Sequence, residues 1–172
     1  MKKIVKILML AAIAAIIPGL MITGCSPSST TAKAIVGQKA PDFTLTSING
    51  ESVSLSDLEG QPVLVNFWRI NCAPCIDELP YLQAVHNEQG DNLVILGINT
   101  GESSSTVKQF AQDNGLSFEI LLDSSVEVAQ KYNIPGTPTT FFIDKDGIIR
   151  AKVIGAFPSK AAIDTRLTEV IS

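Results

Sequence analysis

The sequence predicts an α/β fold with a mixed central sheet flanked by helices. Apolar runs of strand length alternate along the chain with longer segments that have helical periodicity, a pattern typical of α/β domains. The chain closes with two strands around the turn "DKDG" and a last helix. The sequence has no internal repeat and no sign of a second core, so we expect one domain.

The domain should open with a β-hairpin, because Asn49 and Gly50 form a strong turn dipeptide between segments of alternating polarity. "PVLVNFW" (residues 62–68) is almost continuously apolar, as expected of a strand that is buried on both faces. Residues 73–89 carry apolar side chains at helical spacing, and Pro80 within them predicts a kink.

The second half of the chain supplies the rest of the sheet. A helix is expected at residues 103–115, with a serine cap at its start and Gly115 at its end. The other expected elements are strands at 92–100, 118–122, 139–144 and 148–155, and helices at 124–133 and about 159–171.

The N-terminus predicts a lipoprotein signal peptide over residues 1–24. Lysines precede an apolar run at residues 7–17, and a Pro-Gly pair ends that run before it reaches the ~20 residues of a membrane span. The motif "ITGC" that follows resembles the bacterial lipobox, whose cysteine, here Cys25, is lipidated and becomes the mature N-terminus. Polar residues 25–35 then form a flexible tether, and the domain occupies residues 36–172.

The charge of the mature chain excludes some partners. Without the three lysines of the signal, 10 basic residues face 17 acidic ones, a formal charge of −7. Such a chain is not expected to bind nucleic acid or to adhere electrostatically to anionic lipid. Attachment to the membrane, on its extracytoplasmic side, is therefore assigned to the lipid on Cys25, and we expect a monomer.

Cys72 and Cys75 form a CxxC pair that could bind metal, carry haem, staple the fold or exchange electrons. Structural zinc needs four ligands, and the chain adds only His86, expected on a helix surface. Haem of the c type needs histidine after the second cysteine, where Ile76 stands. A purely structural disulfide remains an alternative, but closing so short a loop removes little conformational entropy from the unfolded chain. The sequence thus favours a redox disulfide between Cys72 and Cys75, with no metal and no cofactor.

The position of the pair suggests how it reacts. Cys72 stands where a buried strand gives way to a helix, and the unpaired N–H groups of a helix start favour a thiolate. Pro74 suits the first turn, where its missing N–H costs nothing. We therefore expect Cys72 to be the exposed attacking sulfur and Cys75 to be the more buried, resolving one.

Three motifs along the chain resemble the membrane-anchored thioredoxin-like oxidoreductases of the TlpA/ResA group. They are "GQKAPDFTL", "NFW…CAPC…ELP" and "YNIPGTPTTFFIDKDGII", and the resemblance covers residues 36–172. It implies a thioredoxin fold with an N-terminal β-hairpin and a centrally inserted strand and helix. It also implies a cis Pro138 opposite the CxxC and contacts to substrate from Gly136, Thr137 and Trp68. A cis bond there lets residue 137 pair with a bound peptide strand.

The resemblance also assigns a role to Glu78, which matches a glutamate that the family keeps near its active site. Glu78 follows Cys75 by one helical turn. Thioredoxin keeps a buried aspartate on the preceding strand, but this chain has Asn66 there, which cannot titrate. We therefore assign proton handling to Glu78, the alternative being a solvated helix carboxylate. Asp77 is expected to face water.

The residues just before Cys72 depart from the family pattern. Thioredoxin-like sites usually have tryptophan directly before the first cysteine, whereas this chain has Asn71. Asn71 removes a flat apolar face that relatives offer to a partner. Arg69 adds a cation that could stabilise a thiolate, select an acidic partner or simply face water. The redox class is unaffected, but the identity of the partner is open.

These observations predict a thiol-disulfide oxidoreductase of the reductase type, anchored by lipid outside the cytoplasmic membrane. Its clients would be proteins with disulfides, and the resemblance suggests apocytochrome c. Because that compartment is oxidising, a membrane thiol-electron donor must restore the dithiol. A thiol-dependent peroxidase is one alternative, since "APDFTL" also occurs in peroxiredoxins, although the P-x-x-x-[ST]-x-x-C pattern is missing. A copper chaperone on the same fold is another.

Overall fold

The computed structural model describes residues 33–171 of the chain. The predicted signal peptide and Cys25 lie outside these residues, so their assignment stays a prediction. None of the helices between residues 33 and 171 combines the length and apolar character that crossing a membrane requires.

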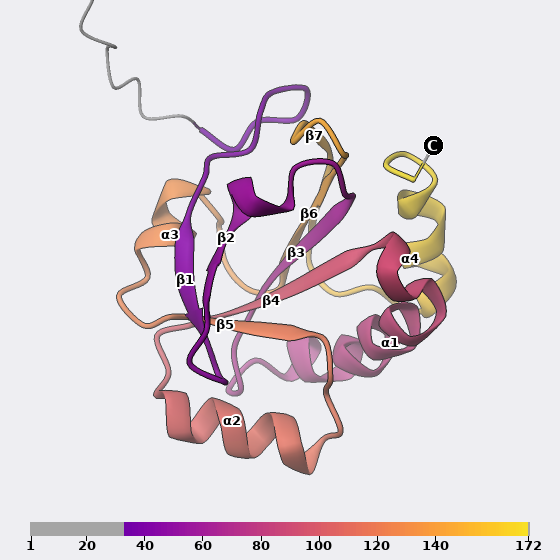
Figure 1. The fold of residues 1–172 in the computed structure, drawn as a ribbon. Helices are drawn as coiled ribbons and strands as arrows, with labels where there is room; N and C mark the ends of the chain where they lie inside the picture. Colours follow the sequence, from indigo (N-terminus) through magenta and orange to yellow (C-terminus); the bar gives the residue numbers. More distant parts are fainter. Residues whose placement is uncertain (1–32, 172) are drawn as a thin grey trace, which may run out of the picture. The chain divides into compact units, whose positions relative to one another are not determined.

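Seven strands form one mixed sheet in the order β2-β1-β5-β4-β3-β6-β7 (Figure 1). Strands β3, β4 and β5 run parallel, whereas the hairpin β1–β2 and the strands β6 and β7 pair antiparallel to their neighbours. The strands are β1 (Thr44–Ser47), β2 (Ser52–Ser54), β3 (Val63–Trp68), β4 (Val94–Thr100), β5 (Glu119–Asp123), β6 (Thr139–Ile143) and β7 (Ile149–Ile154). The predicted mixed sheet and N-terminal hairpin are confirmed.

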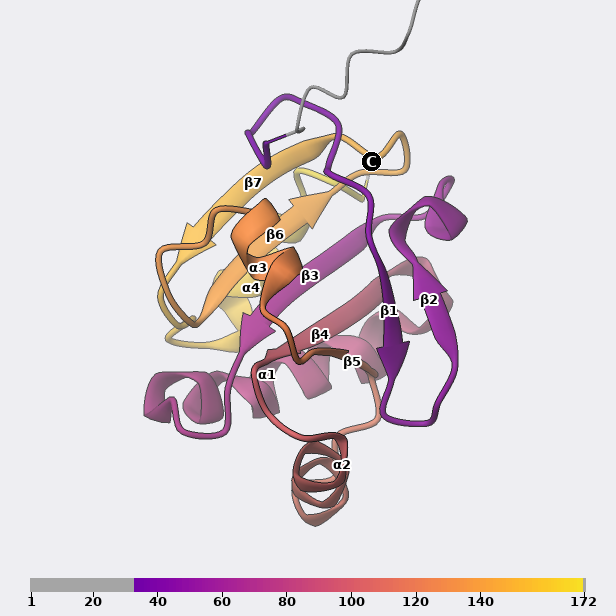
Figure 2. The same ribbon diagram turned by 90° about the vertical axis from the view of Figure 1, so that its left-hand side faces the viewer.

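Helices cover both faces of the sheet (Figure 2). The helices are α1 (Ala73–Gln89), α2 (Ser104–Asp113), α3 (Glu127–Lys131) and α4 (Lys160–Leu167), with short 3₁₀ turns at Leu55–Leu58 and Gly90–Asn92. Helices α1, α2 and α4 bury apolar side chains in one core. Helix α3 and the segment before β1 pack into the other. Helix α2 and strand β5 form the expected insertion between β4 and α3.

Two helices are shorter than the sequence predicts. Helix α4 ends at Leu167, and the turn that follows still buries Val170. Helix α3 starts late because Val126 before it has a left-handed backbone (φ 63°), which cannot belong to a right-handed helix. The carboxylate of Asp123 accepts hydrogen bonds from the backbone N–H groups of Val128 and Ala129 and so caps α3.

Candidate active site

The CxxC pair and the cis-proline loop meet because β3 and β6 are antiparallel neighbours. The register pairs Phe67, near the end of β3, with Thr139, the first residue of β6. The loop that leaves β3 toward Cys72 therefore lies beside the loop that enters β6 from Pro138. All six residues of β3 are buried, which fixes this end of the strand in the centre of the molecule.

Cys72 and Cys75 are joined by a disulfide at the start of α1. Cys72 is the N-cap residue and is half-buried, whereas Cys75, one turn into the helix, is fully buried. Pro74 lies in the first turn, as expected. Only Cys72 is therefore accessible to another protein. The backbone N–H groups of the first helical turn favour its thiolate when the disulfide is reduced.

The loop opposite the cysteines contains a cis peptide bond between Thr137 and Pro138, as predicted. The carbonyl oxygen of Thr137 lies 3.4 Å from Sγ of Cys72. The backbone N–H of Thr137 has no hydrogen-bond partner among residues 33–171. The carbonyl oxygens of Gly136 and Pro138 accept hydrogen bonds from the Thr139 hydroxyl and from the N–H of Gly155. Thr137 thus presents a free backbone donor directly beside the accessible sulfur.

Glu78 is fully buried, so the alternative of a solvated helix carboxylate is wrong. One carboxylate oxygen accepts from the side-chain amide of Asn66 at 2.8 Å, and the other accepts from the backbone N–H of Phe157 at 2.8 Å. Burial raises the pKa of the Glu78 carboxyl above its ordinary value, while these two hydrogen bonds partly oppose that shift. A carboxyl that holds its proton more readily, one turn from Cys75, suits proton exchange with a thiol.

Asn66 is part of this site, which the sequence did not reveal. Its amide nitrogen donates both to Glu78 and to the hydroxyl of Thr140 on β6, at 2.8 and 2.9 Å. The asparagine therefore positions the Glu78 carboxylate and does not titrate itself. The one available signal was an amide in the middle of an apolar strand, since a buried polar group needs a partner.

Two expectations about individual side chains need correction. Trp68 cannot contact a substrate, because it is fully buried and packs against Phe110 with ring centroids 5.5 Å apart. The sheet pleat points its indole into the core. His86 lies in α1 as expected, but its side chain is half-buried and not fully exposed, with its ring 6.4 Å from that of Phe118. Asp77 faces water as expected.

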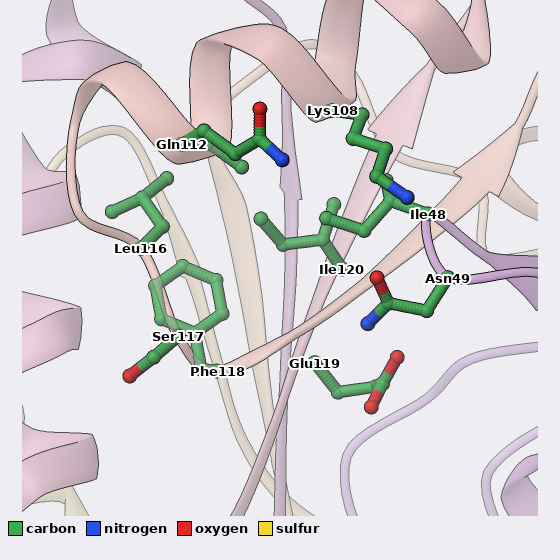
Figure 3. A pocket seen from close by; sticks show the side chains of 10 residues that line it. Ile48, Asn49, Lys108, Gln112, Leu116, Ser117, Phe118, Glu119 and Ile120 are labelled. Atoms are coloured by element: carbon green, nitrogen blue, oxygen red, sulfur yellow. The ribbon is translucent and has the colours of Figure 1, made fainter.

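A separate pocket lies between α2, the β1–β2 turn and the start of β5 (Figure 3). Ile48 and Ile120 are among its apolar lining residues, and Lys108 and Glu119 are its charged ones. Burial raises the pKa of Glu119. None of the predicted site residues lines this pocket, so it is distinct from the CxxC site.

Comparison with known proteins agrees with this geometry. Residues 36–152 match the AhpC/TSA family. The thiol-disulfide oxidoreductase ResA of Geobacillus kaustophilus is 39% identical over 138 residues, which cover 78% of this chain and 78% of that protein. The chain belongs to the ResA-like thiol-disulfide oxidoreductases of this family. Its activity is accordingly thiol-disulfide exchange through the Cys72–Cys75 pair.

Solved structures of similar proteins share the fold. A thiol:disulfide interchange protein of the thioredoxin family from Chlorobium tepidum superposes with a TM-score of 0.72 at 26% identity, covering 80% of this chain and 99% of that one. The pneumococcal exposed lipoprotein thioredoxin Etrx1 from Streptococcus pneumoniae gives a TM-score of 0.65 at 31% identity, covering 75% and 99%. The expected thioredoxin fold is thereby confirmed.

Proposed function

We propose that this ResA-like protein reduces disulfides in client proteins outside the cytoplasmic membrane, to which a lipid on Cys25 anchors it. The observation that carries the proposal is the burial of Glu78 one helical turn beyond Cys75. A buried carboxylate disfavours a nearby thiolate by like-charge repulsion. Strong oxidants of this type owe their potential to a stabilised reduced form, and Glu78 acts in the opposite direction.

The residues between the cysteines support the same direction of exchange. Ala73 and Pro74 carry no ionisable group. A cationic side chain at either position would stabilise the thiolate of Cys72 and hence the reduced form. Without one, the dithiol gives up its electrons more readily, as a reductase requires.

The reaction proceeds through two exchanges. The Cys72 thiolate attacks one sulfur of the client disulfide, forms a mixed disulfide and releases the other client sulfur as a thiolate. Glu78 accepts the thiol proton of Cys75 as that sulfur attacks Cys72. This second step forms the Cys72–Cys75 disulfide and releases the remaining client sulfur as a thiolate, which takes up a proton. Two electrons have then passed to the client, and a membrane dithiol donor restores the protein by the reverse exchange.

Apocytochrome c is the client class that we favour, with an oxidised Cys-x-x-Cys-His segment as the substrate. An extended segment of that kind can pair with the free N–H of Thr137 while its sulfur meets Cys72. For the anchor, Etrx1 is itself described as an exposed lipoprotein, which supports a lipid on Cys25 here.

Cys25→Ser should release the protein from the membrane fraction and leave its ability to reduce an oxidised Cys-x-x-Cys-His peptide intact. The anchor is removed, while the residues that carry the chemistry are unchanged. Fractionation followed by a peptide-reduction assay measures both properties, with Ser29→Ala in the tether as the control. A soluble product without activity would contradict the proposal, and peroxide consumption without peptide reduction would favour the peroxidase alternative.

A further inference from the structure

A pocket of about 280 Å³ lies beside the cis-proline loop, next to the core into which α3 packs. Val126, Ala129 and Ile134 belong to its apolar lining. Thr137 forms the edge nearest the cysteines, because its carbonyl oxygen lies 3.4 Å from Sγ of Cys72. A client strand that pairs with Thr137 while its sulfur meets Cys72 can therefore place a neighbouring residue over this pocket.

Arg69 is the one charged residue among those that line the pocket, all of which belong to the described part of the chain. Its side chain is exposed and forms no ion pair or hydrogen bond within residues 33–171. The guanidinium passes close to Gly101, where an added Cβ would lie 3.8 Å from it. A free guanidinium that lines a pocket together with the apolar residues Val126, Ala129 and Ile134 suits a side chain with an apolar stem and a carboxylate head.

The walls of the pocket are fixed before any client arrives. Val126 has a left-handed backbone, which is a strained conformation for a β-branched residue. Asp123 maintains it: its carbonyl oxygen accepts from the N–H groups of Gly101 and Val126, and its buried carboxylate caps α3. The turn therefore presents a preformed surface, which lowers the entropy cost of recognition.

We propose that this pocket receives an acidic side chain that flanks the reactive cysteine of the client, and that Arg69 pairs with its carboxylate. Arg69 is then a specificity-determining residue. The proposal rests on the proposed function, since it names the chemistry of the client that the same site reduces. The preference comes from local pairing, because the mature chain as a whole is acidic and repels acidic clients at long range.

The test compares peptides with an oxidised Cys-x-x-Cys pair that differ only in carrying Glu, Gln or Lys one or two positions from either cysteine. At its best position, Glu should raise kcat/KM over Gln by roughly fivefold at low salt, the range of a solvent-accessible ion pair. Arg69→Gln should bring the ratio of kcat/KM between the Glu and Gln peptides close to one, and Arg69→Glu should make the Lys peptide the preferred substrate. Arg166→Gln, which changes an exposed arginine on α4, should keep the wild-type ratio.

The possible failures can be told apart. If the wild type reduces none of the peptides, the proposed reductase function fails. If it reduces the Glu, Gln and Lys peptides equally well at every position, reduction stands and the acidic subsite is overturned. If Arg69→Gln changes kcat/KM for all peptides by one common factor, Arg69 acts on the Cys72 thiolate and does not select among clients. A Glu preference that survives in 1 M salt would also contradict an ion pair at this exposed site.

Discussion

Cys75→Ser should accumulate covalent adducts with client proteins, because the first mixed disulfide then has no sulfur to resolve it. The expectation follows from the geometry: Cys72 is accessible at the helix start, whereas Cys75 is fully buried beneath it. Turnover should fall by roughly 10³-fold or more, as for the loss of a residue that acts as part of a catalytic unit. Non-reducing electrophoresis and mass spectrometry of the adducts provide the measurement.

Cys72→Ser is the matched control, and it should lose turnover equally while trapping almost nothing. A buried Cys75 sulfur cannot approach a folded client without opening the first turn of α1. Equal trapping by the two variants would contradict the assignment of Cys72 as the attacking sulfur.

Glu78→Gln should lower the apparent pKa of the reduced cysteine pair and slow the resolving step by roughly tenfold or more. The substitution removes a like charge but keeps the shape of the side chain. Its amide can find an acceptor in Oδ1 of Asn66, a buried atom that lacks a partner within the described residues. Thiolate absorbance against pH measures the first effect, and Asp77→Asn, on the exposed side of α1, is the control. If Asp77→Asn shifted the cysteine pKa more than Glu78→Gln does, the assignment of proton handling to Glu78 would be wrong.

The same substitution should change how stability depends on pH. Because burial raises the pKa of Glu78 in the folded protein, the folded state keeps the carboxyl proton up to a higher pH than the unfolded state does. The stability that Glu78 contributes is therefore fully present at pH values below the pKa of the unfolded state, near 4.5. It is lost as the pH rises through the higher pKa of the folded state. As the pH rises from the unfolded to the folded pKa of Glu78, the free energy of unfolding of the oxidised wild type should fall relative to that of Glu78→Gln. Denaturant titrations of both oxidised proteins test this, and a constant difference would contradict it.

Elements with a strong local signal could be predicted from the sequence. The buried apolar run gave β3, and α1 spans Ala73–Gln89 as expected because its apolar spacing is helical and Gly90 stops it. The Asn49-Gly50 turn likewise fixed the hairpin. The cis bond before Pro138 followed from a resemblance, since the local sequence alone would favour trans.

Features that depend on tertiary contacts could not be predicted. The burial of Trp68 follows from which face of β3 meets α2, and a strand that is apolar on both faces does not reveal this. The bond between Asn66 and Glu78 joins a strand to a helix 12 residues later, so neither periodicity nor propensity reports it. The pocket beside Thr137 is lined in part by Val126, whose backbone conformation valine rarely takes, so the local sequence does not report it.

The reduction potential of the Cys72–Cys75 pair tests the central claim most directly. Equilibration of the protein with a glutathione or dithiothreitol buffer, read by the fraction of free thiol, provides the value. If buried Glu78 disfavours the thiolate as we infer, the potential should lie between about −200 and −300 mV, as in proteins that reduce client disulfides. A potential near about −120 mV, that of a strong disulfide donor, would contradict a reductase.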